Sequence, residues 1–289
     1  MVERLNFYDV YGYLIPGLVF VGLLWLPFAL ENETFLRLDW SSALLVLVLA
    51  YITGHIIQGL VMSALPSTKR DKGNRYPSDF LLDGDDTTLS PEVRDRITLR
   101  VAIKFGLDVK DPVRPEDRPA VSKRRSDGFL MCRRALIQDG LASYAEQFEG
   151  MYALMRGLSG ACILGLGYYI GLFIRYLARD VLNISIPSAF TVGAVLMTFL
   201  ALLLAVLAVC SASRRKNIQA LLFWLTVFLL LMLATLLPPD VDAASAPSFL
   251  VLVSVILVFV ALRCYTAYDE YSRLFAATVY RDFGALKLS

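Results

Sequence analysis

A short polar stripe inside an apolar segment is the first place where this sequence could do chemistry. The segment YITGHIIQG (residues 51–59) contains His55, the single histidine of the chain. Tyr51, His55 and Gln58 are spaced four and three residues apart, so a helix places them on one face. In lipid such a face turns towards protein or water, and we expect an interhelical hydrogen bond or, alternatively, a gate, proton sensor or pore lining. A metal site is not predicted because no Cys, Asp or Glu lies nearby.

A second stretch, GLSGACILG (residues 157–165), contains a candidate nucleophile, Ser159. Its Gly-x-Ser-Gly pattern resembles the serine motif of rhomboid intramembrane proteases, in which the catalytic histidine follows the serine. Here His55 precedes the serine, and no second His/Asn motif for an oxyanion is present. We therefore favour small residues that let helices approach closely, and we predict no enzyme, no metal and no cofactor. The packing residues are Gly157, Ala161, Gly165, Gly167 and Gly171.

Two clusters of basic residues could contact anionic groups. The first, within residues 69–75, could meet lipid headgroups. The second, at residues 123–125, could meet a protein partner or a nucleotide. The favoured interpretation of both is a solvated basic surface. Residues 66–156 contain 17 basic and 15 acidic residues, which is too balanced for a dedicated nucleic-acid surface, so direct nucleic-acid binding is not expected. The clusters are Lys69, Arg70, Lys72 and Arg75, and Lys123, Arg124 and Arg125.

The elements that must position these residues are apolar helices. Hydrophobic residues make up 57% of the chain and charged residues 19%, with a mean hydropathy of +0.58, whereas soluble domains have about 45–50% and about 25%. A helix of about 20 apolar residues crosses a hydrocarbon core of about 30 Å. Six apolar runs are therefore predicted to span a membrane: 14–30, 43–65, 157–174, 189–211, 220–237 and 248–262.

The distribution of Lys and Arg predicts how these spans are oriented. The connection 31–40 contains a single Arg and the connection 238–247 contains none, whereas residues 66–156 contain 17 of the 28 Lys and Arg residues. Basic residues are enriched in cytoplasmic connections. The pattern predicts six spans with both termini in the cytoplasm.

The segment 66–156 is long enough to form a soluble helical insert. Ser90 and Pro91 form a helix start, with an N-cap serine followed by a proline at the first helical position. Gly106 is typical of a helix end. Residues 108–127 are rich in proline and charge, and we expect them to be extended.

Two helices are expected to continue past the membrane. Residues 143–176 form a single pattern roughly 50 Å long at 1.5 Å per residue, and the last apolar run continues through residue 283. Each extension carries an apolar stripe, so the two should pack together. The residues predicted to couple them are Phe148 and Tyr152 on one, and Tyr271 and Phe275 on the other.

The predicted fold class is all-α: a polytopic membrane protein with six transmembrane helices and a helical cytoplasmic bundle. Its expected parts follow the order of the apolar runs. They are an N-terminal transmembrane hairpin (1–65), a cytoplasmic helical insert (66–156), a four-helix transmembrane region (157–262) and a C-terminal cytoplasmic helix (263–289).

Three stretches, FYDVYGYLIPGL, AYITGHIIQGL and SYAEQFEGMYALMRGL, resemble multi-pass membrane proteins of bacterial anti-phage defence loci. The resemblance implies an antiviral effector in the bacterial inner membrane that pairs with a soluble cytoplasmic protein, oligomerises and compromises the bilayer, for example by forming a pore. We therefore expect a non-enzymatic membrane effector or a membrane-anchoring subunit. The alternatives are a constitutive channel or facilitator for a small solute, and a membrane scaffold.

Overall fold

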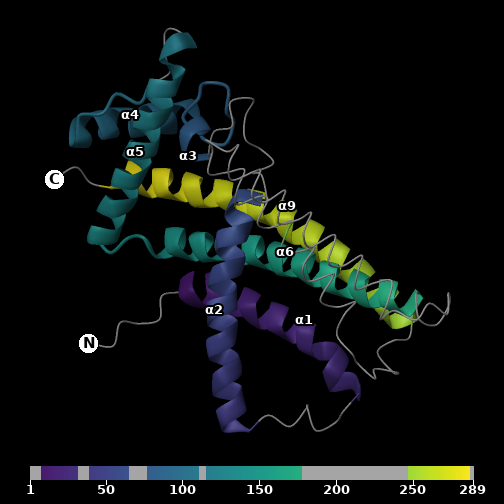
Figure 1. The fold of residues 1–289 in the computed structure, drawn as a ribbon. Coiled ribbons are helices and arrows are strands. Elements are labelled where there is room, and N and C mark those ends of the chain that lie inside the picture. The colour runs from purple at the N-terminus through teal and green to yellow at the C-terminus, as the bar shows by residue number, and fades with distance from the viewer. Residues whose placement is uncertain are drawn as a thin grey trace, which may run out of the picture. The chain divides into compact units, whose positions relative to one another are not determined.

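The computed structural model describes residues 8–31, 39–64, 77–110, 115–177, 225 and 247–286. Regular secondary structure in these ranges is helical throughout, which confirms the all-α prediction for the described part of the chain (Figure 1). The chain divides into two compact units. Unit 1 comprises residues 1–66 and 153–266, and unit 2 comprises residues 67–152 and 267–289.

Within the described ranges, four helices are long and apolar enough to cross a membrane. They span Asp9–Leu30, Trp40–Met62, Tyr144–Tyr176 and Pro247–Ala285. These helices contain the first, third and sixth predicted runs and most of the second. The fourth and fifth predicted runs lie outside the described residues, apart from residue 225, which is helical.

Unit 1 begins with a π-helix, η1 (Asp9–Leu14), that continues directly into α1 (Ile15–Glu31). Pro16 is tolerated because it lies at the start of α1, although its missing N–H interrupts the regular bonding of the preceding turn. Helix α2 (Trp40–Ala64) is capped by Asp39, whose Oδ1 accepts the N–H of Ser42 at 2.9 Å. Hydrogen bonds from Ser42 and Ser41 lower the pKa of Asp39 to about 2, so this cap persists in mildly acidic solution.

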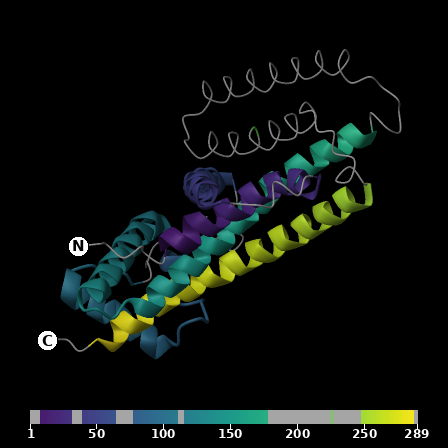
Figure 2. The ribbon, with the colours of Figure 1, turned by 90° about the horizontal axis from the view of Figure 1, so that it is seen from below.

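Helices α1 and α2 cross steeply, as Figures 1 and 2 show from two directions. Two glycines form the crossing. A Cβ added to Gly17 would overlap the carbonyl oxygen of Ala50, and one added to Gly54 would overlap the carbonyl oxygen of Tyr13. The two backbones are therefore in direct contact, which only residues without a side chain allow.

Unit 2 contains the short helices, and most of its local features follow from the sequence. They are α3 (Pro77–Phe80), α4 (Pro91–Phe105), η3 (Pro115–Asp117) and α5 (Arg118–Gln138). The predicted boundaries of α4 are confirmed: Ser90 Oγ accepts the N–H of Val93 at 3.4 Å, and Gly106 ends the helix with φ of 69°. A positive φ is readily adopted by glycine.

The prediction for the proline-rich connector is wrong in its second half. Residues 108–127 were expected to be extended, but α5 begins at Arg118 and includes residues 118–127. Pro119 lies in the first turn of α5, where a missing N–H has no intrahelical partner to lose. The proline therefore starts the helix here.

Helices α6 (Ser143–Tyr176) and α9 (Pro247–Ala285) are each continuous, as predicted, and each contributes residues to both units. The end of α9 is fixed within unit 2 by several polar contacts. Arg100 of α4 donates to the carbonyl oxygens of Phe283, at 3.2 Å, and Leu286, and the hydroxyl of Tyr280 donates to the Ser78 carbonyl at 2.6 Å. The fully buried side chains of this core include Leu81, Leu82, Ile97, Leu136, Tyr280 and Phe283.

The crossing of α1 and α2 can be tested with alanine, which adds one methyl group. Gly54→Ala should destabilise the purified protein by about 1–3 kcal/mol, because the new Cβ meets backbone that cannot move aside. Gly59→Ala in the same helix is the matched control, since nothing lies within 4 Å of its added Cβ. Thermal unfolding in detergent measures both, and an equal response of the two variants would contradict the direct backbone contact.

Candidate functional site

The candidate site of unit 1 is a buried polar cluster around Gln58. Its side chain is 4% exposed, and its amide nitrogen donates to the carbonyl oxygens of Gly12 and Ala153, each at 2.7 Å. Its amide oxygen accepts the Nε–H of Arg156 at 2.7 Å. Two carbonyl acceptors on one side and a donor on the other fix the orientation of the amide. One side chain therefore ties η1, α2 and α6 together.

The local sequence makes room for this amide. Gly12 lies within η1, where an added Cβ would be 3.2 Å from the Cβ of Ala153. Gly157 lies beside the amide, where an added Cβ would be 2.7 Å from Gln58 Nε2 and 2.5 Å from Pro16 Cγ. Small residues on η1 and α6 thus allow a long polar side chain of α2 to reach both backbones.

Arg156 places a positive charge inside unit 1. Its side chain is 6% exposed, and besides Gln58 it reaches the hydroxyl of Tyr8, at 3.5 Å. A guanidinium stays charged at all accessible pH values. The cluster therefore cannot transfer a proton through Arg156, but it holds a fixed cation at the point where three helices meet.

The three residues of the predicted polar stripe occupy different environments. Gln58 is buried, whereas His55 and Tyr51 are exposed. The His55 ring stacks on Tyr13 with ring centroids 3.7 Å apart, and Tyr51 meets His55 edge-on at 4.6 Å. The sequence places Gln58 on a polar stripe but does not identify its partners, although Arg156, directly before the third apolar run, is a signal that points to one of them.

Ser159 and the small residues of α6 lie in the interior of unit 1. The Ser159 hydroxyl donates to the carbonyl of Ala261 at 3.1 Å, so its partner is α9 and not the imidazole of His55. An added Cβ would overlap Val61 at Gly160 and would be 2.8 Å from Leu23 Cδ1 at Gly165. The other small residues predicted to pack, Gly157, Ala161, Gly167 and Gly171, are all buried.

In unit 2 the four residues predicted to couple α6 and α9 are part of aromatic pairs. Phe148 lies 6.4 Å from Tyr271, measured between ring centroids, and Tyr152 stacks on Tyr268 at 5.0 Å. Phe275 meets Phe129 of α5 edge-on at 5.6 Å. The first two pairs join α6 to the second half of α9, whereas Phe275 joins α9 to α5.

Arg125 was predicted to lie on a solvated basic surface, and this prediction is wrong. Its side chain is 1% exposed, and its donors bind the carbonyl oxygens of Val109 at 2.9 Å, Asp79 at 3.0 Å and Leu82 at 3.3 Å. It also forms an ion pair with Asp83. Lys123 and Arg124 are exposed, as expected. The other predicted basic residues, Lys69, Arg70, Lys72 and Arg75, lie outside the described residues.

The prediction for Arg125 is wrong because the start of α5 was predicted to be extended and not helical. Within α5, Arg125 follows Val121 by four residues and precedes Phe129 by four, and all three are buried. Residues four apart share one helix face. Once α5 is known to begin at Arg118, the sequence itself places Arg125 on the apolar face.

Among the described residues of unit 2, Cys132 carries a buried thiol. Burial raises the pKa of the Cys132 thiol to about 12, although Lys104 opposes this, so the thiol stays protonated and unreactive at neutral pH. Among the described residues, no group of three His, Cys, Asp or Glu side chains could hold a metal ion.

Comparison of this chain with models of protein families, with curated proteins and with solved structures finds no match.

A double-mutant cycle tests the polar cluster. Gln58→Leu should destabilise the protein by at least about 2 kcal/mol, because it leaves two buried carbonyl oxygens and the Nε–H of Arg156 without their partner. Gln58→Leu combined with Arg156→Leu should lose less than the sum of the single variants, since the partner group is then absent too. Unfolding of all three variants in detergent gives the coupling energy, and additive losses would contradict it.

Neighbouring arginines provide a matched test of the buried cation in unit 2. Arg125→Lys should destabilise the protein by at least about 2 kcal/mol, because one ammonium group cannot reproduce the fork that binds three carbonyl oxygens. Arg124→Lys makes the same exchange at an exposed position and should change stability by less than about 0.5 kcal/mol. Indistinguishable melting curves for the two variants would contradict the assigned role of Arg125.

Proposed function

We propose that this chain is a non-enzymatic, multi-pass membrane effector or membrane-anchoring subunit, in which unit 2 receives a signal or a protein partner. The observation that carries the proposal is the continuity of α6 and α9. Each is apolar enough to cross a membrane, and each also provides part of the core of unit 2. A partner bound to unit 2 therefore acts directly on helices that also belong to unit 1.

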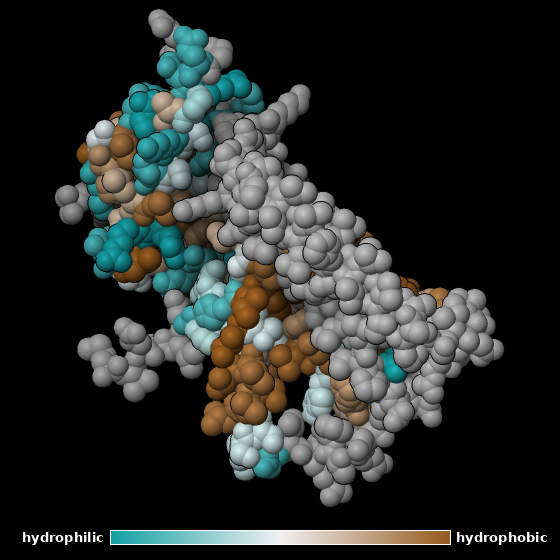
Figure 3. Space-filling view, viewed as in Figure 1, coloured by the Kyte–Doolittle hydropathy of each residue, from teal (hydrophilic) through white to brown (hydrophobic). Residues whose placement is uncertain are grey.

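The surface of unit 1 supports a lipid environment. Large apolar side chains along α2 are exposed, including Leu44 at 64% and Ile52 at 51%. Figure 3 shows a brown, apolar surface over α2. Phe259 of α9 is 70% exposed. Soluble monomers rarely expose apolar patches of this extent, whereas lipid chains cover such a surface without loss.

The proposed topology has six spans, with both termini and unit 2 in the cytoplasm of a bacterial cell. Cysteines introduced at positions 33, 180 and 242 should then react with an impermeant maleimide in intact cells. Cysteines introduced at positions 85 and 123 should react only after the membrane is permeabilised. The reverse pattern at any position would contradict this topology.

The coupling role can be tested at Phe275, with its neighbour as control. Truncation of a fully buried aromatic side chain costs about 3–5 kcal/mol. Phe275 is partly buried against the core of unit 2, so Phe275→Ala should cost less than this, weaken the contact with Phe129 and alter the membrane response. Leu274→Ala, at an exposed position of the same helix, should leave that response unchanged. Dye uptake and membrane potential are measured in cells that express each variant at equal membrane levels, with and without proteins that copurify in detergent.

The outcomes separate the proposed effector from its alternatives. A response that depends on a copurified protein and differs in Phe275→Ala supports the effector. Flux of a small solute without any partner would indicate a constitutive channel instead, and a partner bound without any change in permeability would indicate an anchoring subunit or scaffold. Wild-type behaviour of Phe275→Ala with the partner present would contradict the coupling.

A further inference from the structure

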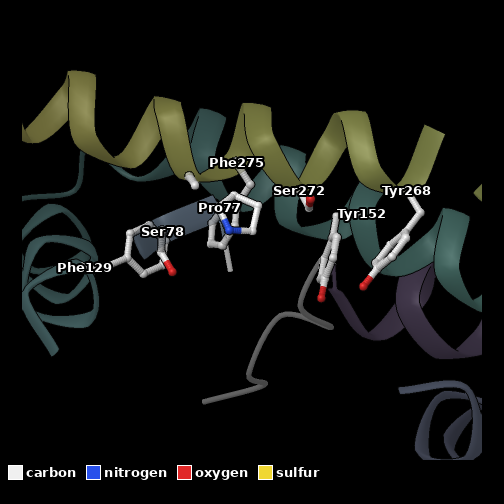
Figure 4. A pocket seen from close by; sticks show the side chains of 8 residues that line it. Pro77, Ser78, Phe129, Tyr152, Tyr268, Ser272 and Phe275 are labelled. Carbon is white, nitrogen blue, oxygen red and sulfur yellow. The ribbon is translucent and has the colours of Figure 1, made fainter. Parts of the chain in front are cut away.

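We propose that unit 2 contains a binding pocket for a small, neutral, single-ring aromatic compound that carries one hydrogen-bond donor. The pocket has a volume of about 140 Å³ and lies among α3, α5, α6 and α9 (Figure 4). The residues that line it are Pro77, Ser78, Phe129, Tyr152, Tyr268, Ser272, Phe275 and Ala276.

The volume sets the size of the ligand. A cavity of about 150 Å³ engineered into another protein binds benzene, so the pocket of unit 2 is large enough for one six-membered ring with a small substituent. A second ring would extend beyond this volume. The side chains of Phe129, Tyr268 and Ala276 are buried, so widening the pocket at these positions is disfavoured.

The lining sets the chemical class. Four of the eight lining residues are aromatic, and Figure 4 shows Tyr152 and Tyr268 side by side with their hydroxyl groups pointing the same way. Aromatic rings favour a ring between or against them in stacked or edge-on geometry. The pocket is therefore suited to an aromatic ring more than to a flexible aliphatic chain.

The polar atoms of the lining determine which substituent and which charge state of a ligand the pocket favours. The Ser272 hydroxyl already donates to the carbonyl of Asp269 at 2.8 Å, so it faces a ligand as an acceptor and favours a donor such as a phenolic O–H. None of the eight lining residues is charged. A charged ligand would lose its hydration without gaining a charged partner in the lining, so the neutral form should bind.

Two of the lining residues, Tyr152 and Phe275, also belong to the residues proposed to couple α6 and α9. Tyr152 pairs with Tyr268, and Phe275 pairs with Phe129, so a ligand in the pocket touches both aromatic pairs. This inference goes beyond the proposed membrane role. Binding is measured on purified protein, and its outcome is independent of whether the chain permeabilises a membrane.

The experiment measures binding of phenol to the full chain in detergent by ligand-observed NMR, with benzoate as the charged comparison. Phenol should bind saturably with a dissociation constant of roughly 0.1 to 1 mM, as expected for seven non-hydrogen atoms. Benzoate should bind at least about tenfold more weakly at pH 7. Saturating phenol should also raise the melting temperature, because it binds the folded state.

Matched variants of α9 separate the pocket from partition into detergent. Ser272→Phe fills the pocket and should abolish saturable binding, whereas Leu274→Phe adds a ring at an exposed position outside the pocket and should retain it. Ser272→Leu repeats the test with a smaller side chain if Ser272→Phe does not fold. Equal binding by the filled and control variants, or no saturable binding by folded wild-type protein, would overturn the proposal.

Discussion

Unit 1 depends on one constraint: a polar group among apolar helices must have a hydrogen-bond partner. Gln58 of α2 meets it by using both of its amide hydrogens and its oxygen, which bond to the backbone of η1 and to the backbone and a side chain of α6. In an apolar environment, leaving a donor or acceptor without a hydrogen bond costs more free energy than forming that hydrogen bond gains. The amide therefore specifies which helices come together, while the glycines decide how closely they do so.

In unit 2 the buried polar group that needs hydrogen-bond partners is charged: it is the guanidinium of Arg125. Arg125 is buried among the side chains of α3 and α5, and its fork holds the carbonyl oxygens of three residues that belong to two separate loops and a short helix. Four-residue helices such as α3 have little stability of their own. A buried cation that binds carbonyl oxygens gives such a short segment a fixed position, and that position forms one wall of the pocket beside Phe129.

Features governed by near neighbours were predictable from the sequence. The N-cap at Ser90, the glycine at position 106 and the uninterrupted apolar periods of α6 and α9 each depend on residues within one or two turns. The pairing of Gln58 with Arg156 could not be predicted in this way, because 98 residues separate them and either could have met a different helix. The burial of Arg125 is an intermediate case. It follows from local periodicity, but only after the start of α5 is placed at Arg118 and not after the prolines.

The π-helical turn of η1 has a consequence for insertions and deletions in this chain. A π-turn bonds residue i to residue i+5 and so contains one residue more than an α-turn. Deletion of one residue within Asp9–Leu14 would let the turn close as a regular α-helix and leave α1 intact. Tyr8 would keep its angular position relative to Arg156, because the wider turn holds the extra residue by itself. A deletion in the regular part of α1 would instead rotate the preceding residues by about 100° around the helix axis. The wider turn of η1 is thus a position at which the chain can lose one residue without changing the angular register of the helix on either side.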